Sequence, residues 1–273
     1  MTGETVAARG LGRPIPRTYA GYLTQVWAVA DAEVTKLRHD PMDLVSRAVQ
    51  PILWLLLFGQ VMAHVRGLAA GGSYLDFLAP GILAQSVLFV AIFYGLSAIW
   101  ERDLGVLHRY MVSPAPRSAL VIGKALASSV RGISQSIVIY ACAAVMGVKL
   151  SFAPGHILLV ALFIVLASAL FSTFSLIIAC IVKTRERFMG IGQFLTMPIF
   201  FASNAIYPIA LMPGWLRAIA RFNPLSYEVD GLRSLMLSHG QSQFGLTVDL
   251  GALGLGVCVV TVIATRMYPR LTQ

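Results

Sequence analysis

The chain has 273 residues, of which 57% are hydrophobic and only 12% are charged. An average soluble domain carries about 25% charged residues, so a soluble fold of this size could not bury so much apolar surface, whereas a lipid bilayer accepts it. The net charge of +9 does not indicate nucleic-acid binding, because the basic residues flank the apolar runs, as they do in membrane proteins. The composition therefore predicts one membrane domain.

The N-terminal part of the chain differs in character from the rest. Residues 1–20 are polar and are expected to form a cytoplasmic tail. Residues 21–39 carry apolar side chains at helical spacing until Pro41 ends the pattern, which predicts an amphipathic helix on the membrane surface or on other protein. We therefore expect a tail and interfacial helix over residues 1–40 and a transmembrane domain over residues 41–273.

Six apolar segments are long enough to cross a bilayer, since a spanning helix needs about 20 apolar residues. The predicted spans are residues 44–65, 75–99, 119–147, 156–182, 188–209 and 247–267. With both termini in the cytoplasm, 14 of the 21 Lys and Arg residues flank the inner side, 5 flank the outer side and 2 lie in the third span. This excess predicts cytoplasmic termini. The third-span pair is Lys124 and Arg131, of which Arg131 either reaches back to the interface or faces a pathway.

Residues 100–117 join the second and third spans on the cytoplasmic side and are too patterned for a plain loop. Apolar residues follow one helical face, and the charged residues are Glu101, Arg102, Asp103 and Arg109. Such a helix suits contact with a soluble partner protein, because its apolar face gives affinity and its charges give register. An ordinary interfacial connector explains the pattern equally well.

Residues 194–233 begin as the fifth span and then break at Pro208, Pro213 and Pro224. The pieces between the prolines are too short to cross a bilayer, which predicts re-entrant or interfacial helices on the outer face. The expected fold is thus all-α and integral to the membrane, with a surface helix, six spans and re-entrant helices between spans five and six. Asp230 and Arg233, three residues apart, are expected to form an ion pair.

The stretches ERDLGVLHRYMVSPAPRSALVIGK (101–124) and SNAIYPIALMPGWLRAIARFNPLSYEVDGLR (203–233), within the six-span pattern, resemble the type 2 ABC transporter permease family. This family includes multidrug and antibiotic-resistance exporters as well as polysaccharide and lipo-oligosaccharide exporters. The resemblance implies the permease subunit of an ATP-driven exporter of an amphipathic drug or lipid-like substrate, with a lipid-linked glycan as the alternative. It also implies a multi-pass protein of the cell inner (plasma) membrane, and the high Ala, Gly and Val content favours a bacterial source.

The resemblance also implies roles for three sets of residues. The helix that docks into a cytoplasmic ATPase would use Glu101, Arg102, Asp103, Gly105, Leu107, Arg109 and Tyr110. The outer gate would include Pro208, Pro213, Trp215, Asn223 and Pro224. The second and fifth spans would line the dimer interface. Their aromatic and Met faces also suit an apolar substrate, although an aromatic stripe is typical of plain helix packing too, and the pathway candidates are Gln85, Phe89, Phe93, Phe194, Met197, Phe201 and Asn204.

The chain itself is not expected to be an enzyme. Gly123–Lys124 is its one Gly-Lys pair, and Ser118 and Ala125 stand where a phosphate-binding loop needs Gly and Ser or Thr. ATP and Mg²⁺ would therefore bind to a partner, namely two ATPase subunits that join this chain and a second permease half, identical or related. No metal site or other cofactor is expected on this chain. A non-transporting membrane scaffold is the alternative from another class.

Overall fold

The computed structural model describes residues 31, 35, 41–59, 61, 73–104, 117–182, 184–238 and 240–268. Within these residues the chain is mostly helical and has no β-strand, only an isolated bridge between Leu150 and Leu237. This agrees with the predicted all-α fold. The predicted surface helix at 21–39 lies outside the described residues, apart from helical positions 31 and 35.

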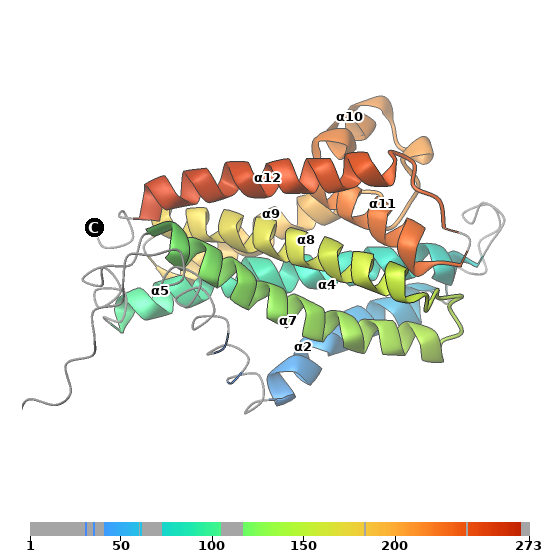
Figure 1. Ribbon diagram of the computed structural model, residues 1–273, viewed down its shortest axis with the longest axis horizontal. Coiled ribbons are helices and arrows are strands. Elements are labelled where there is room, and N and C mark those ends of the chain that lie inside the picture. Colours follow the sequence, from blue (N-terminus) through green and yellow to red (C-terminus); the bar gives the residue numbers. More distant parts are fainter. Residues whose placement is uncertain are drawn as a thin grey trace, which may run out of the picture.

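The described helices lie mainly side by side along the longest axis of the molecule (Figure 1). They are α2 (Pro41–Leu53), the π-helix η1 (Trp54–Phe58), α4 (Tyr74–Tyr94), α5 (Leu96–Asp103), α7 (Arg117–Val145), α8 (Pro154–Ile181), α9 (Arg185–Phe201), the 3₁₀-helix η2 (Ile209–Leu211), α10 (Gly214–Phe222), α11 (Pro224–Met236) and α12 (Leu246–Met267). The helix α5 and the C-terminal end of α12 lie at one end, and α10 protrudes towards the other (Figure 1).

Among the described residues, three helices are long and apolar enough to cross a membrane. They are Tyr74–Asp103, which is α4 continued by α5, then Pro154–Ile181 and Leu246–Met267. They coincide with the second, fourth and sixth predicted spans. The first predicted span holds a shorter apolar helix, Ser46–Phe58, and the third corresponds to α7, which has 29 residues and is less apolar.

The fifth predicted span, residues 188–209, is wrong at its C-terminal end. The helix α9 has 17 residues and ends at Phe201. The Ser203 hydroxyl donates to the Phe200 carbonyl at 2.7 Å and accepts from the Ala205 N–H at 3.2 Å. These bonds close a turn in place of a further helical turn, and Pro198 already lacks the N–H that would support the last turn.

Local sequence signals set the starts of several helices. Ser73, Thr184 and Asn223 each accept a hydrogen bond from a backbone N–H two or three residues later, which satisfies a free donor at the start of α4, α9 and α11. Pro154 and Pro224 occupy the first positions of α8 and α11, where a missing N–H does no harm.

The second span is interrupted at Gly95, between α4 and α5. The Ser175 hydroxyl of α8 donates to the Ile92 carbonyl at this joint. A Cβ atom on Gly95 would lie only 2.0 Å from Ser175 Oγ. Gly95 therefore lets α8 approach the joint closely, and the hydroxyl of Ser175 supplies a donor to the carbonyl there.

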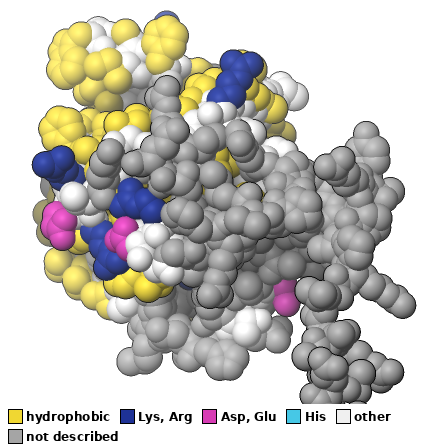
Figure 2. Space-filling view, turned by 90° about the vertical axis from the view of Figure 1, so that its left-hand side faces the viewer, with side chains coloured by type: hydrophobic (Ala, Val, Ile, Leu, Met, Phe, Trp, Pro, Cys, Tyr) yellow, Lys and Arg dark blue, Asp and Glu magenta, His cyan; other side chains and the backbone are white. Residues whose placement is uncertain are grey.

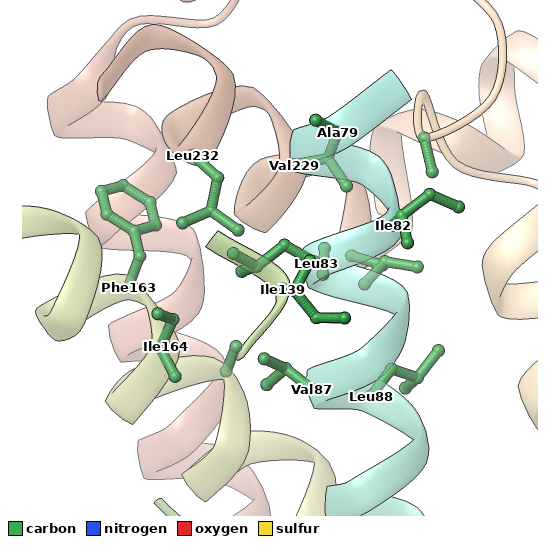
Figure 3. Packing of buried hydrophobic residues seen from close by; sticks show 14 of the residues in the cluster. Ala79, Ile82, Leu83, Val87, Leu88, Ile139, Phe163, Ile164, Val229 and Leu232 are labelled. Atoms are coloured by element: carbon green, nitrogen blue, oxygen red, sulfur yellow. The ribbon is translucent and has the colours of Figure 1, made fainter. Parts of the chain in front are cut away.

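The core lies where α4, α7, α8 and α11 meet. Figure 3 shows side chains from all four helices converging, among them Ala79, Ile82, Leu83, Val87, Leu88, Ile139, Phe163, Ile164, Val229 and Leu232. Gly231 brings α11 close to α8, because a Cβ there would lie 2.2 Å from the Phe163 ring. By contrast, α12 exposes Leu255, Val259 and Val262, as a lipid-facing helix does.

The close approach at Gly81 gives a test of this packing. A Cβ on Gly81 would lie 2.3 Å from the Ala205 carbonyl oxygen, which is backbone and cannot rotate away. We expect Gly81→Ala to destabilise the protein by about 1–3 kcal/mol, measured by thermal unfolding in detergent. The control is Gly254→Ala on α12, where nothing lies within 4 Å of the new Cβ. Equal stability of both variants would contradict the packing described.

Candidate functional site

The last turn of α5 forms a charged junction with α7 and α9. We define the charged junction as Trp100, Glu101, Arg102, Asp103, Lys124 and Arg185. Figure 2 looks onto this end of the molecule, where basic and acidic side chains gather among apolar ones. Glu101–Asp103 continue the second span as helix, and so the predicted docking helix does not begin as a separate element at residue 100.

Glu101 and Lys124 form an ion pair between α5 and α7. Lys124 Nζ lies 2.8 Å from Glu101 Oε1 and 2.7 Å from Oε2. The Lys124 side chain is 10% exposed and that of Glu101 is 25% exposed. Each charged group has therefore lost much of its hydration, and the ion pair compensates for this loss. Glu101 thus turns toward the protein, and its predicted part in docking an ATPase stays a prediction.

Asp103 joins α5 to the first turn of α9. Arg185 places its Nε 3.0 Å and a terminal nitrogen 2.9 Å from Asp103 Oδ2. The Arg185 guanidinium also lies 3.9 Å from the centre of the Trp100 ring, and Arg102 contacts the other oxygen of Asp103 at 3.2 Å. An exposed ion pair alone contributes little, but the two-nitrogen contact and the aromatic face together fix the geometry of Arg185.

The remaining predicted docking residues cannot be placed. Gly105, Leu107, Arg109 and Tyr110 lie between residues 104 and 117, outside the described residues. The described part of the chain therefore shows the two ends of this segment, at α5 and α7, and how the charged junction connects the α5 end to α9.

A cleft of about 250 Å³ lies among α2, α4 and α9. It is lined by Arg47, Gln50, Pro51, Gln85, Ser86, Phe89, Val90, Phe93 and Gln193. The rings of Phe89 and Phe93 lie nearly parallel, with centres 6.0 Å apart and 29° between their planes. The cleft therefore combines an aromatic wall with three carboxamides and one guanidinium.

The cleft unites only part of the predicted pathway. Gln85, Phe89 and Phe93 line it together. The fifth-span candidates do not: Phe194 and Phe201 are 74% and 43% exposed, Met197 is half-buried, and Asn204 is fully buried beyond the end of α9. Arg131 is also absent from the lining, and it lies 5.3 Å from the centre of the Tyr94 ring.

Arg47, Gln50 and Gln193 line the cleft without having been predicted there. A polar residue inside an apolar run is the signal that could have found them, since a polar group at membrane depth needs a polar partner or water. Gln50 interrupts the first span and Gln193 the fifth. Aromatic periodicity pointed instead to the exposed face of α9.

The predicted outer-gate residues mark the ends of short helices. Pro208, Pro213 and Pro224 each precede or begin a helix. Asn223 caps α11 and donates from Nδ2 to the Ile199 carbonyl at 2.6 Å, while Trp215 is 68% exposed on α10. The structure thus explains why the chain turns here, and the gate itself stays a prediction.

The expected ion pair between Asp230 and Arg233 is wrong. Arg233 donates to the Asn204 and Phe77 carbonyls at 2.8 and 3.3 Å, and its guanidinium lies 3.9 Å from the centre of the Phe77 ring. Asp230 Oδ2 accepts hydrogen bonds from Ser242 Oγ and from the backbone N–H groups of Gln243 and Phe244, at 2.7–3.0 Å. Both side chains satisfy buried backbone groups of other segments, which helical spacing alone does not reveal.

The Glu101–Lys124 pair predicts a strong effect of removing one partner. Lys124→Met should destabilise the protein by about 2–3 kcal/mol, because it leaves Glu101 partly buried without its cation. The double variant Glu101→Gln, Lys124→Met should recover most of this loss. The measurement is the free energy of unfolding in mixed micelles for the wild type, both single variants and the double variant. Purely additive effects would show that the two side chains do not interact.

Comparison with known proteins places the chain in a family. A family model described as ABC-2 type transporter matches residues 24–237, which include the charged junction, the cleft and the segment with Pro208, Pro213 and Pro224. The daunorubicin resistance ABC transporter permease protein DrrB1 of Streptomyces coeruleorubidus is 29% identical over 256 residues, covering 90% of this chain and 85% of the relative.

Two further relatives agree with this assignment. The inner membrane transport permease YadH of Escherichia coli is 26% identical over 236 residues, covering 83% of this chain and 87% of the relative. A protein of Cyanophora paradoxa that carries a transport-permease name, ycf38, is 29% identical over 218 residues, covering 78% of this chain and 74% of the relative. The family match spans most of the chain, and the chain therefore belongs to the ABC-2 type transporter family.

Proposed function

We propose that this chain is the transmembrane permease subunit of an ATP-driven exporter that moves an amphipathic drug or lipid-like substrate outward. Membership of the ABC-2 family and the relatives named as permeases support a transport role. The drug-resistance name of DrrB1 favours a drug-like substrate. The observation that carries the proposal is the charged junction, because it connects the segment after α5 to α9, which in turn lines the cleft.

The proposed coupling follows the path of these contacts. A cytoplasmic ATPase, with ATP and Mg²⁺ bound to it, docks on the segment that includes Gly105, Leu107, Arg109 and Tyr110. Movement of that segment displaces the last turn of α5, and Asp103 transmits the displacement to Arg185. Because α9 is a continuous helix from Arg185 to Phe201, it carries the movement to Gln193 in the cleft.

The proposed assembly contains two ATPase subunits, this chain and a second permease half that is identical or related. It lies in the inner (plasma) membrane with both termini in the cytoplasm, which places the charged junction inside and α10 outside. The inner-membrane name of YadH supports this location. The turns at Pro208 and Pro213 and the capped start of α11 then form the outer gate.

The charged junction provides the test of this proposal. The permease is expressed with its neighbouring ATPase and purified, and drug efflux is measured in reconstituted vesicles. We expect Arg185→Ala to lower ATP-driven efflux about tenfold, the scale of a coupling free energy, while the ATPase still co-purifies. The control is Arg187→Ala, which removes the same charge from an exposed position one half-turn away.

The outcomes separate the parts of the proposal. If no ATPase co-purifies with the wild type, the chain is not an exporter subunit and a membrane scaffold becomes the better account. If an ATPase co-purifies and Arg185→Ala transports as well as Arg187→Ala, the contact between Asp103 and Arg185 is not the coupling path.

A further inference from the structure

We infer that the cleft among α2, α4 and α9 binds an uncharged, flat amphipathic molecule that donates a hydrogen bond to the carboxamide of Gln85. This inference rests on the proposed function and deepens it, because it gives the exported substrate a chemical class.

Gln85 is the first reason for this assignment. Its side chain is 2% exposed and lines the cleft, yet its carbonyl oxygen has no hydrogen-bond partner among the described residues. A buried acceptor without a donor is unfavourable, and one beside a cleft is satisfied when a ligand brings a hydroxyl or N–H group. Its neighbour Ser86 differs, because its hydroxyl already donates to the Ile82 carbonyl at 2.9 Å.

The aromatic wall is the second reason. Phe89 and Phe93 lie one helical turn apart on α4 and present nearly parallel rings along the cleft. The backbone of α9 approaches this wall, since a Cβ on Gly192 would lie 3.7 Å from the Phe93 ring. A flat ring system packs well against such a wall. The cleft volume of about 250 Å³ is close to the lower limit for small-molecule pockets, so the ligand, or the part of it bound here, is small.

The charge of the lining is the third reason. Among the described residues that line the cleft, none carries a carboxylate, and Arg47 is cationic. Gln50, Gln85 and Gln193 supply carboxamides, which donate and accept hydrogen bonds without net charge. A cation entering the cleft would lose water without gaining an opposite charge from these residues, so an uncharged ligand is preferred.

Three matched anthraquinones test this inference by equilibrium binding to the full-length permease in lipid nanodiscs, with binding to empty nanodiscs subtracted. The probes are 2-(hydroxymethyl)anthraquinone, which is uncharged and donates, 2-(aminomethyl)anthraquinone, which is cationic, and 2-methylanthraquinone, which has no donor. We expect the hydroxymethyl compound to bind about fivefold to tenfold more tightly than either of the others. Equal or tighter binding of the cationic compound would overturn the preference for an uncharged ligand.

Gln85→Met separates a ligand-binding role from a structural one. We expect this variant to lose the difference between the hydroxymethyl and methyl compounds. Its melting temperature should be unchanged or higher, because an unpaired buried amide has been removed. The control is Gln135→Met, because Gln135 is an equally buried carboxamide on α7 that does not line the cleft, and this variant should bind all three compounds like the wild type. A Gln85→Met variant that still distinguishes the two compounds would overturn the role of Gln85.

Gln50→Glu tests the charge argument without altering the buried part of the cleft. Gln50 is exposed at the cleft, so the variant protein should fold normally. Its new carboxylate should raise the affinity for the aminomethyl compound about fivefold. If the affinity for the aminomethyl compound does not rise, the ligand does not bind next to Gln50. Binding is measured without ATP and does not depend on an ATPase. A missing ATPase would therefore contradict the exporter proposal alone, whereas a failed binding experiment would contradict this inference alone.

Discussion

A lysine within a membrane domain is stabilised by a carboxylate that contacts it, and Glu101 provides this contact to Lys124. The pair fixes the last turn of α5 against α7. Asp103, two residues after Glu101, is then placed to contact Arg185 at the start of α9. The position of the charged junction therefore depends on the ion pair between Lys124 and Glu101. The contact between α5 and α9 depends on it in turn.

The register between packed helices is set more by polar contacts and by glycines, which have no side chain, than by the burial of apolar side chains. In a bilayer, an apolar side chain gains little free energy by moving from contact with acyl chains to contact with protein. Gly81 admits the backbone at Ala205, Gly231 admits the Phe163 ring, and the Ser175 hydroxyl reaches the joint at Gly95. These contacts require one register each, whereas the apolar side chains around them tolerate several. This explains how α11, too short to span, is held within the core.

Hydropathy and proline positions predicted most helices, because the length of an apolar run and the loss of an N–H act locally. They failed where polar side chains bond to backbone groups in place of a regular helical turn or an ion pair. The helix α9 ends early because Ser203 satisfies its last turn, and Arg233 turns away from Asp230 to carbonyls at Asn204 and Phe77. For the cleft, the residues on α4 were predictable from one aromatic face. Gln193 was missed because aromatic periodicity pointed to other residues of α9, although a polar residue within that apolar run is itself a signal.

The break at Gly95 divides the second span into two arms of unequal reach. From Gly95 to Asp103 the helix extends about 12 Å, whereas Phe93 lies only two residues on the other side. A small rotation about Gly95 moves the tip of α5 far and the aromatic ring little. Under such a rotation, a displacement at the tip of α5 would reach the Phe89 and Phe93 wall of the cleft much reduced.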